Sequence, residues 1–135
     1  MNSFDLDGSG TPVPSTRATR RDKGSLGEMT AADFLQEGGY LLRERNWRCR
    51  SGEIDIIAEN EGSLVFVEVR SRSGTAYGTA TESVNARKQA QVRNVAAIYM
   101  HIKGLQDWPV RFDVIAVQLL PDGKAQVTEH ICAAF

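Results

Sequence analysis

Two carboxylates interrupt segments that otherwise have the apolar composition of β-strands. Asp55 lies within GEIDIIAE, and Glu68 lies within LVFVEVRSR. Side chains alternate between the faces of a strand, so Arg70, two residues after Glu68, shares its face. Paired carboxylates beside a cation are suited to bind a divalent metal and to act on phosphodiesters. Asp55, Glu68 and Arg70 are therefore the candidate catalytic residues.

The spacing of the two segments predicts that the carboxylates meet. Asn60–Ser63, with the sequence NEGS, is typical of a hairpin turn. With this turn Asp55 lies directly opposite Glu68, with Cβ atoms about 4.5–5.5 Å apart. Carboxylates at that separation repel unless a cation compensates them or one stays protonated. Mg²⁺ or Mn²⁺ is the expected cofactor because these ions prefer oxygen ligands.

A simpler interpretation is that both acids face solvent on a one-sided sheet. Arg48, Arg50 or Arg70 would then pair with them as ordinary surface ion pairs. The predicted helices argue against a fully exposed face, because two helices flanking one sheet would cover both sides. The spacing alone leaves both interpretations open.

The elements expected around these residues are those of an α/β fold. Ser25 and Glu28 form a capping-box pattern, which predicts a helix from about Ser25 to Gly38 with Met29, Ala32 and Leu35 on its apolar face. The capping box by itself would also account for Glu28. Residues 1–24, rich in Gly, Ser, Thr, Pro and charge, are expected to be a disordered tail before a domain of residues 25–135. The remaining expected elements are strands at 40–48, 53–59, 64–72, 110–120 and 126–132, a loop at 74–83, and a helix at 85–103 with Val92, Val95, Ala96 and Tyr99 buried.

Composition limits the partners that the chain can bind. The chain has 135 residues and a net charge of −1, so it is not a polycation. A nucleic-acid site must therefore come from local clusters of basic residues near the acidic pair. Trp47, among these clusters, could stack on a base or pack in the core. The candidate nucleic-acid-binding residues are Arg48, Arg50, Arg72, Arg87, Lys88 and Arg93.

Cysteine and histidine give no sign of a metal scaffold in the sequence. Cys49 and Cys132 are far apart and form no Cys-x-x-Cys pair, which argues against a disulfide framework or a zinc ribbon. His101 and His130 are also isolated, and structural or surface roles are expected for them. The thiols favour a reduced cytoplasmic compartment. The chain has no apolar run long enough to span a bilayer and no secretory signal.

The ordered motifs resemble a known family. The segments LGE, RNWRCRSGEIDIIA, LVFVEVRSR, YGTATESVNARKQAQVRNVAAIY and RFDVIAV run from Gly27 almost to the end of the chain. In this order they resemble the YraN family of uncharacterised bacterial proteins. They also resemble the resolvase-like branch of the PD-(D/E)XK nuclease superfamily. The resemblance implies a restriction-endonuclease-like αβββαβ core, in which a central mixed sheet is flanked by helices.

The resemblance also implies roles for individual residues. Asp55 and Glu68 fall on the metal ligands of the superfamily, and the backbone carbonyl of Val69 falls on a frequent third ligand. Glu28 falls on the helix-borne glutamate, which implies a metal contact, direct or through water. The superfamily lysine falls on Arg70, and this is a departure, because a guanidinium stays charged and cannot act as a base. Lys88 is a candidate to supply the missing amine from the second helix, although a solvated surface lysine is the plainer interpretation.

Three functions remain open from the sequence. The first is a metal-dependent DNA endonuclease or branched-DNA-processing protein. The second is a nucleic-acid-binding protein that keeps the nuclease fold without efficient chemistry, and the third is a protein-interaction module that uses a sheet edge. The expected partner is nucleic acid, with DNA favoured; no membrane partner is expected, and a homodimer is left open.

Overall fold

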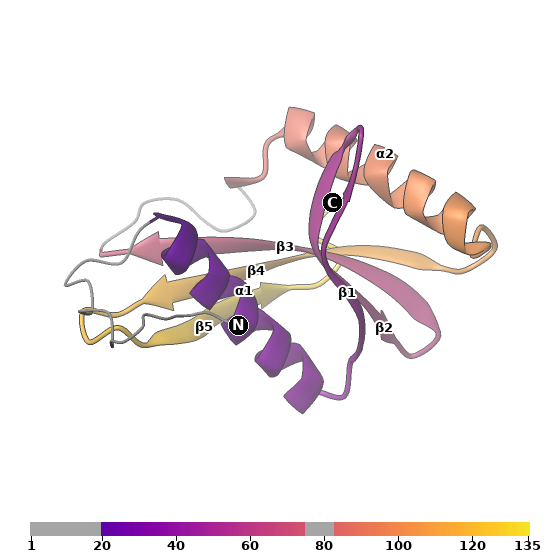
Figure 1. The fold of residues 1–135 in the computed structure, drawn as a ribbon. Helices are drawn as coiled ribbons and strands as arrows, with labels where there is room; N and C mark the ends of the chain where they lie inside the picture. The colour runs from indigo at the N-terminus through magenta and orange to yellow at the C-terminus, as the bar shows by residue number, and fades with distance from the viewer. Residues whose placement is uncertain (1–19, 75–82) are drawn as a thin grey trace, which may run out of the picture.

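The helices and strands follow the predicted order in the computed structural model, which describes residues 20–74 and 83–135 (Figure 1). The helices are α1 (Arg20–Glu37) and α2 (Ala86–Lys103). The strands are β1 (Leu41–Cys49), β2 (Gly52–Asn60), β3 (Ser63–Ser73), β4 (Val110–Leu119) and β5 (Ala125–Ile131). The loop expected between β3 and α2 lies mostly outside the described residues.

The strands form one mixed sheet in the order β1-β2-β3-β4-β5. All neighbouring strands are antiparallel except β3 and β4, which run parallel. A parallel pair requires a long crossover connection, and α2 lies within that connection. This confirms the predicted α/β class and is consistent with a restriction-endonuclease-like core.

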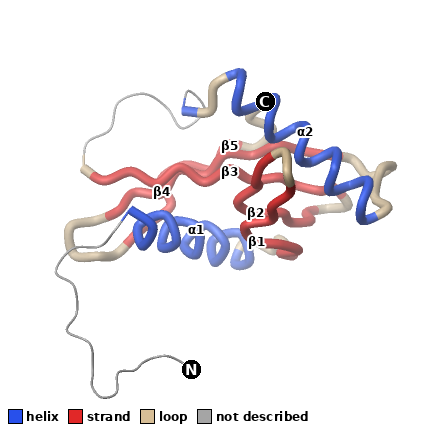
Figure 2. Tube along the Cα trace, turned by 45° about the horizontal axis from the view of Figure 1, so that its top comes forward, coloured by secondary structure: helices blue, strands red, loops and turns tan. Residues whose placement is uncertain are grey.

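The two helices cover opposite faces of the sheet, as Figure 2 shows. The α1 cluster contains Ala31, Ala32 and Leu35, packed against Ile56, Val65, Val67, Ile115 and Val117. The α2 cluster contains the predicted stripe of Val92, Val95, Ala96 and Tyr99, packed against Ile57, Leu64, Phe66 and Phe112. Within the described ranges, neither helix is long and apolar enough to cross a membrane.

Strand alternation places Glu68 on the α2 side of the sheet. Phe66 belongs to the α2 cluster, whereas Val65 and Val67 belong to the α1 cluster. Glu68 is two residues beyond Phe66 and therefore shares its face. Only 2% of Glu68 is exposed, so the interpretation of this acid as a solvent-facing group is wrong.

The turn between β2 and β3 has the predicted register. Asn60 pairs with Ser63, and the two residues between them have positive φ, 51° at Glu61 and 82° at Gly62. Two left-handed residues are what a type I′ hairpin turn requires, and its twist matches that of the strands. The ladder then runs on to the pair Ile56–Val67.

The first helix begins earlier than the sequence indicates. It starts at Arg20 rather than at Ser25, so Ser25 lies inside the helix and the predicted capping box is wrong. The last five residues of the expected tail are therefore helical, and residues 1–19 lie outside the described part. Met29 was expected on the buried face but is 48% exposed. With the cap removed, Glu28 needs another explanation.

Gly27 allows α1 to lie close to the sheet directly beside Glu28. A Cβ added at Gly27 would lie 1.8 Å from Ser71 Oγ and 3.1 Å from Ser71 Cβ. A side chain at this position would therefore push the helix away from β3. The spacing of α1 and β3 at Glu28 depends on this glycine.

We predict opposite effects for alanine at two glycines of α1. Gly27→Ala should lower the free energy of unfolding by about 1–3 kcal/mol, because an added methyl group overpacks the helix–sheet contact. Gly24→Ala is the matched control: a Cβ there meets nothing within 4 Å, and helix propensity should raise stability by about 0.5–1 kcal/mol. Urea unfolding of both variants measures the difference, and equal stabilities would contradict the close-approach argument.

Candidate metal centre at the β2 and β3 carboxylates

Asp55 lies where the backbone pairing between β2 and β3 ends and a side-chain hydrogen bond links the two strands. The backbone pairs end at Ile56–Val67, one step before the predicted pairing of Asp55 with Glu68. There the Asp55 carboxylate, through Oδ2, accepts a hydrogen bond of 2.8 Å from the backbone N–H of Val69. The side chain of Asp55 thus links the two strands and is held beside the strand that carries Glu68.

Asn46 marks an irregularity on the other side of Asp55, and the sequence analysis did not identify it. In the β1–β2 ladder Arg45 pairs with Ile56 and Trp47 with Ile54, so the Asn46–Asp55 position between them is skipped. Asn46 has a φ of 54°, and its side chain is hydrogen-bonded to Glu28. Asparagine is disfavoured in strands but tolerates positive φ, so its presence inside a predicted strand was an available signal.

Glu68 is buried without enough hydrogen-bond partners. Its Oε1 lies 3.5 Å from Lys88 Nζ at the start of α2. Its Oε2 is buried and has no hydrogen-bond partner among the described residues, and the same holds for Arg70 Nε. Buried polar atoms are nearly always paired in native proteins. The unpaired oxygen of Glu68 lies next to a second carboxylate, so a bound cation could interact with both groups.

The charged forms of all three predicted acids are disfavoured here. Burial, followed by the charge of Asp55, raises the pKa of Glu68 from 4.5 to about 7. Burial also raises the pKa of Asp55, against the lowering effect of the Val69 hydrogen bond. Burial and the charge of Asp55 raise the pKa of Glu28. A group of carboxyl groups with raised pKa values is typical of functional sites, and a bound cation would offset the repulsion.

The donor set fits a hard divalent cation. Glu28, Asp55 and Glu68 offer carboxylate oxygens, which suit Mg²⁺ and Mn²⁺. Among the described residues, one group of ligand-type side chains has all its ligand atoms within 4.8 Å of one another. That group contains Asp113 and does not include Glu28, Asp55 or Glu68. The three acids are therefore more widely spread, which suits an ion that keeps several water ligands.

Two cations approach the acidic pair from different elements. Lys88 approaches Glu68 from the first turn of α2. The Asn85 side chain caps this helix by accepting a 2.9 Å hydrogen bond from the Lys88 backbone N–H. Arg70 approaches from β3, and its charge lowers the pKa of both Asp55 and Glu68. The structure thus brings Glu68, Arg70 and Lys88 to Asp55, and Glu28 approaches Asp55 separately from α1.

The other predicted basic residues are distributed around this centre. Gln91 of α2 donates a 3.3 Å hydrogen bond to the Ser51 carbonyl, which joins α2 to the turn that carries Arg50 and follows Arg48 of β1. Arg48 is largely exposed and lies 3.5 Å from Glu53. Arg87 is exposed next to Lys88, and Arg72 lies half-buried on β3, one same-face position beyond Arg70.

Arg93 and Trp47 contact aromatic rings of the structure. The Arg93 guanidinium lies over the rings of Phe112 and Phe135, 4.9 Å and 5.4 Å from their centroids. Trp47 packs edge-on against Tyr99, with centroids 5.1 Å apart, beside the α2 cluster. The core role that the sequence left open for Trp47 is therefore the one observed.

Comparison with known proteins identifies relatives without an assigned activity. Residues 27–117 match the model of the uncharacterised protein family UPF0102. A UPF0102 protein of Moorella thermoacetica is 45% identical over 117 residues, covering 87% of this chain and 98% of the relative. A UPF0102 protein of Symbiobacterium thermophilum is 48% identical over 104 residues, covering 77% of this chain and 88% of the relative.

Among solved structures, the chain is similar to SfsA of Pyrococcus furiosus, described as a complex with Ca²⁺. The match has a TM-score of 0.37 and 11% identity and covers 82% of this chain. The chain spans 63% of that structure, which is less than two thirds. A similarity this weak supports no argument about this chain, and the site is interpreted from its own geometry.

We predict that the raised pKa of Glu68 makes the metal-free protein less stable as pH rises. The folded state holds the Glu68 proton more tightly than the unfolded state, so the contribution of Glu68 to stability is fully present below pH 4.5 and is lost as pH rises to about 7. Glu68→Gln stays neutral and should flatten this fall. Melting temperatures between pH 5 and pH 8 measure it, with the exposed Glu129→Gln as control. Identical pH profiles for wild type and Glu68→Gln would contradict the prediction.

Proposed function

The chain belongs to the uncharacterised protein family UPF0102, whose name assigns no activity, and from its site we propose a function. We propose that the protein hydrolyses phosphodiester bonds in DNA with a divalent metal. One observation carries this proposal: a buried Glu68 with an unpaired Oε2 lies beside Asp55 and faces Lys88. A buried carboxylate that is only partly compensated lowers stability, so a ligand that compensates it is the simplest reason for its presence.

The proposed metal is Mg²⁺ or Mn²⁺. Asp55 and Glu68 would hold it, and Glu28 would contact it directly or through water. The bound ion would activate a water molecule and offset the negative charge that develops on the phosphate. The hydrogen bond from the Val69 N–H holds the Asp55 carboxylate in place before any ligand arrives.

The two cations have different chemical abilities. Arg70 keeps its charge and can orient water or stabilise the negative charge of the transition state, but it cannot accept a proton. Lys88 carries an amine, which can release and take up a proton at Nζ. Its Nζ lies 3.5 Å from Glu68 Oε1, although Lys88 comes from a different element than Arg70. Lys88 is thus the better candidate for the role of the superfamily lysine.

DNA is the proposed substrate because exposed cations lie near the centre. Arg48 is exposed near the end of β1, Arg50 on the β1–β2 turn, and Arg87 on the first turn of α2 next to Lys88. Phosphate contacts by such residues position a nucleic acid without reading its sequence. Branched or processed DNA, recognised by shape and backbone, is therefore the proposed class.

A second candidate function rests on Arg70. If Lys88 does not replace the lysine, the site lacks an amine for water activation, and the protein would bind nucleic acid without efficient cleavage. The buried, unpaired Nε of Arg70 is compatible with both candidates. Cleavage assays separate them.

We predict that the acidic pair binds metal. Calorimetric titration with Mn²⁺ or Mg²⁺ should give binding that Asp55→Asn abolishes, because the substitution removes one carboxylate charge and keeps the shape of the side chain. Glu129→Gln, an exposed acid on β5, is the matched control and should bind like wild type. Equal binding by wild type and Asp55→Asn would remove the proposed metal site.

We predict graded effects on cleavage of a labelled four-way DNA junction in Mn²⁺. Arg70→Ala should lower the rate about 10²–10³-fold, because one preorganised donor to the transition state is lost. Arg70→Lys should keep or raise the rate, since lysine retains the charge. Lys88→Gln should lower the rate strongly, whereas Lys124→Gln, at the exposed β4–β5 turn, should not.

DNA affinity distinguishes chemistry from binding in the same variants. Loss of one phosphate contact changes the slope of log affinity against log salt by only about one unit, so Arg70→Ala should still bind. If wild type and Arg70→Lys both fail to cleave with any divalent metal yet bind DNA, the non-catalytic candidate replaces the nuclease. If neither binds DNA, both candidates are wrong.

A further inference from the structure

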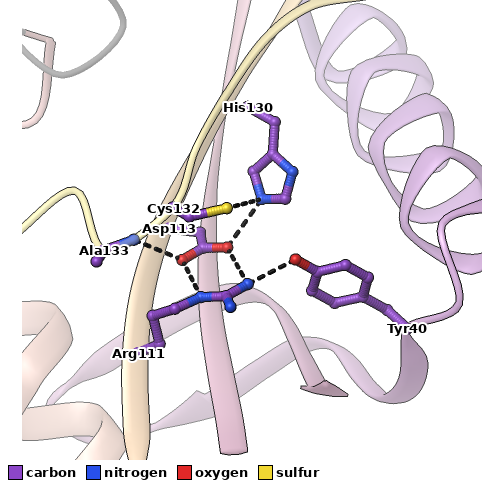
Figure 3. A network of polar contacts seen from close by, with 6 residues as sticks. All are labelled: Tyr40, Arg111, Asp113, His130, Cys132 and Ala133. Carbon is purple, nitrogen blue, oxygen red and sulfur yellow. Dashed lines mark hydrogen bonds and ion pairs between the residues drawn. The ribbon is translucent and has the colours of Figure 1, made fainter. Parts of the chain in front are cut away.

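A second group of ligand-type side chains lies at the C-terminal end of the chain, away from the acidic pair. Asp113 of β4, His130 of β5 and Cys132 just after β5 have their ligand atoms within 4.8 Å of one another (Figure 3). The sequence analysis treated His130 as isolated and did not connect these three residues. The spacing of two residues between His130 and Cys132, which puts both on one side of an extended chain, was the available signal.

The same nitrogen of His130 contacts both of the other groups. His130 Nε2 lies 2.8 Å from Asp113 Oδ2 and 3.6 Å from Cys132 Sγ. In a Cys–His–Asp catalytic triad the imidazole uses one nitrogen for the acid and the other for the nucleophile. Here the carboxylate, imidazole and thiol all converge on Nε2, which excludes a triad and is the arrangement of ligands around one ion.

The distances agree with a zinc-type ion. Zinc–nitrogen bonds of about 2.0–2.1 Å and zinc–sulfur bonds of about 2.3 Å, at a tetrahedral angle, separate nitrogen and sulfur by about 3.6 Å. The observed Nε2–Sγ distance matches this value. The nitrogen and oxygen ligands would be about 3.3 Å apart, so the His130–Asp113 contact must lengthen by about 0.5 Å.

The surroundings hold the ligands in place. Asp113 is fully buried; Arg111 donates to its Oδ1 from Nε and to its Oδ2 from Nη2, both at 2.9 Å, and the Ala133 N–H donates to Oδ1 at 3.0 Å. The rings of Phe34 and Tyr40 lie 5.7 Å and 5.9 Å from the His130 ring. These contacts hold the carboxylate and the imidazole in place, as outer-shell partners do in metal sites.

One side of the group is open to solvent. Cys132 is exposed, whereas the side chain of His130 is only 14% exposed and that of Asp113 is buried. An ion can therefore enter past Cys132, and water can occupy a fourth position. Three protein ligands with one open position are a known zinc arrangement.

We propose that Asp113, His130 and Cys132 form a site for a borderline-soft divalent ion of the Zn²⁺ class. Thiolate and imidazole ligands favour Zn²⁺ or Co²⁺ over Mg²⁺, so this site and the acidic pair select different metals. The ion would bind His130 Nε2 and replace its hydrogen bond to Asp113 Oδ2, with the ring proton on Nδ1. The Cys132 thiol releases its proton to solvent. The bound ion ties β5 and the following segment to the centre of β4.

Cobalt reports this site directly. Under a phosphine reductant, Co²⁺ added to the full-length protein should give a sulfur-to-cobalt charge-transfer band in the near ultraviolet, which Zn²⁺ removes by displacement. Cys132→Ser should abolish the band and lower Co²⁺ affinity about 100-fold or more, because the thiolate ligand is lost. Cys49→Ser is the matched control, since Cys49 is the other free cysteine, and it should keep the band.

Two further variants make the outcome decisive. His130→Gln should weaken Co²⁺ binding and remove the rise in melting temperature that Zn²⁺ gives to wild type. Asp55→Asn should leave both effects intact, so the result does not depend on the nuclease proposal. No charge-transfer band in wild type, or an unchanged band in Cys132→Ser, would overturn the proposed site.

Discussion

Burial of the Glu68 carboxylate beside Asp55 is the constraint on which the centre of this molecule depends. The position of Glu68 on β3 places it under α2, where Leu64 and Phe66 of the same face are fully buried. A folded chain normally avoids such a group because desolvation and like charge both raise its free energy. Lys88 and Arg70 compensate it only in part, since one oxygen of Glu68 stays unpaired.

The surrounding elements have features that serve this one location. The ladder on each side of β2 is irregular at Asp55, where Asn46 adopts positive φ on β1 and Val69 donates to Asp55 from β3. Gly27 lets α1 approach β3 closely, which brings Glu28 near Asp55. Local departures from regular structure at one point, supported by a rigid sheet, are typical of functional sites.

The sheet separates two groups with different metal preferences. On β4, Ile115 packs in the α1 cluster, whereas Phe112 and Val114 pack in other clusters. Asp113 is two residues before Ile115 and therefore lies on the same face of the sheet as Ile115. Asp113 and His130 therefore lie toward α1, while Glu68 lies toward α2. The acidic pair offers oxygen ligands, and the second group offers nitrogen and sulfur as well. Under the two proposals, one sheet would position a hard ion and a softer ion without competition between them.

The sequence by itself determined the element order, the β2–β3 register and the meeting of Asp55 with Glu68, because hairpin turn chemistry and strand alternation are local. It misplaced the start of α1, since residues 20–24 contain no proline and the helix can extend beyond a local capping pattern. Only the tertiary structure decided that Glu68 is buried, that Lys88 reaches it from α2, and that Asn46 contacts Glu28. It also joined Asp113 to His130 and Cys132, because strand pairing brings together residues that are 17 or more positions apart in the chain.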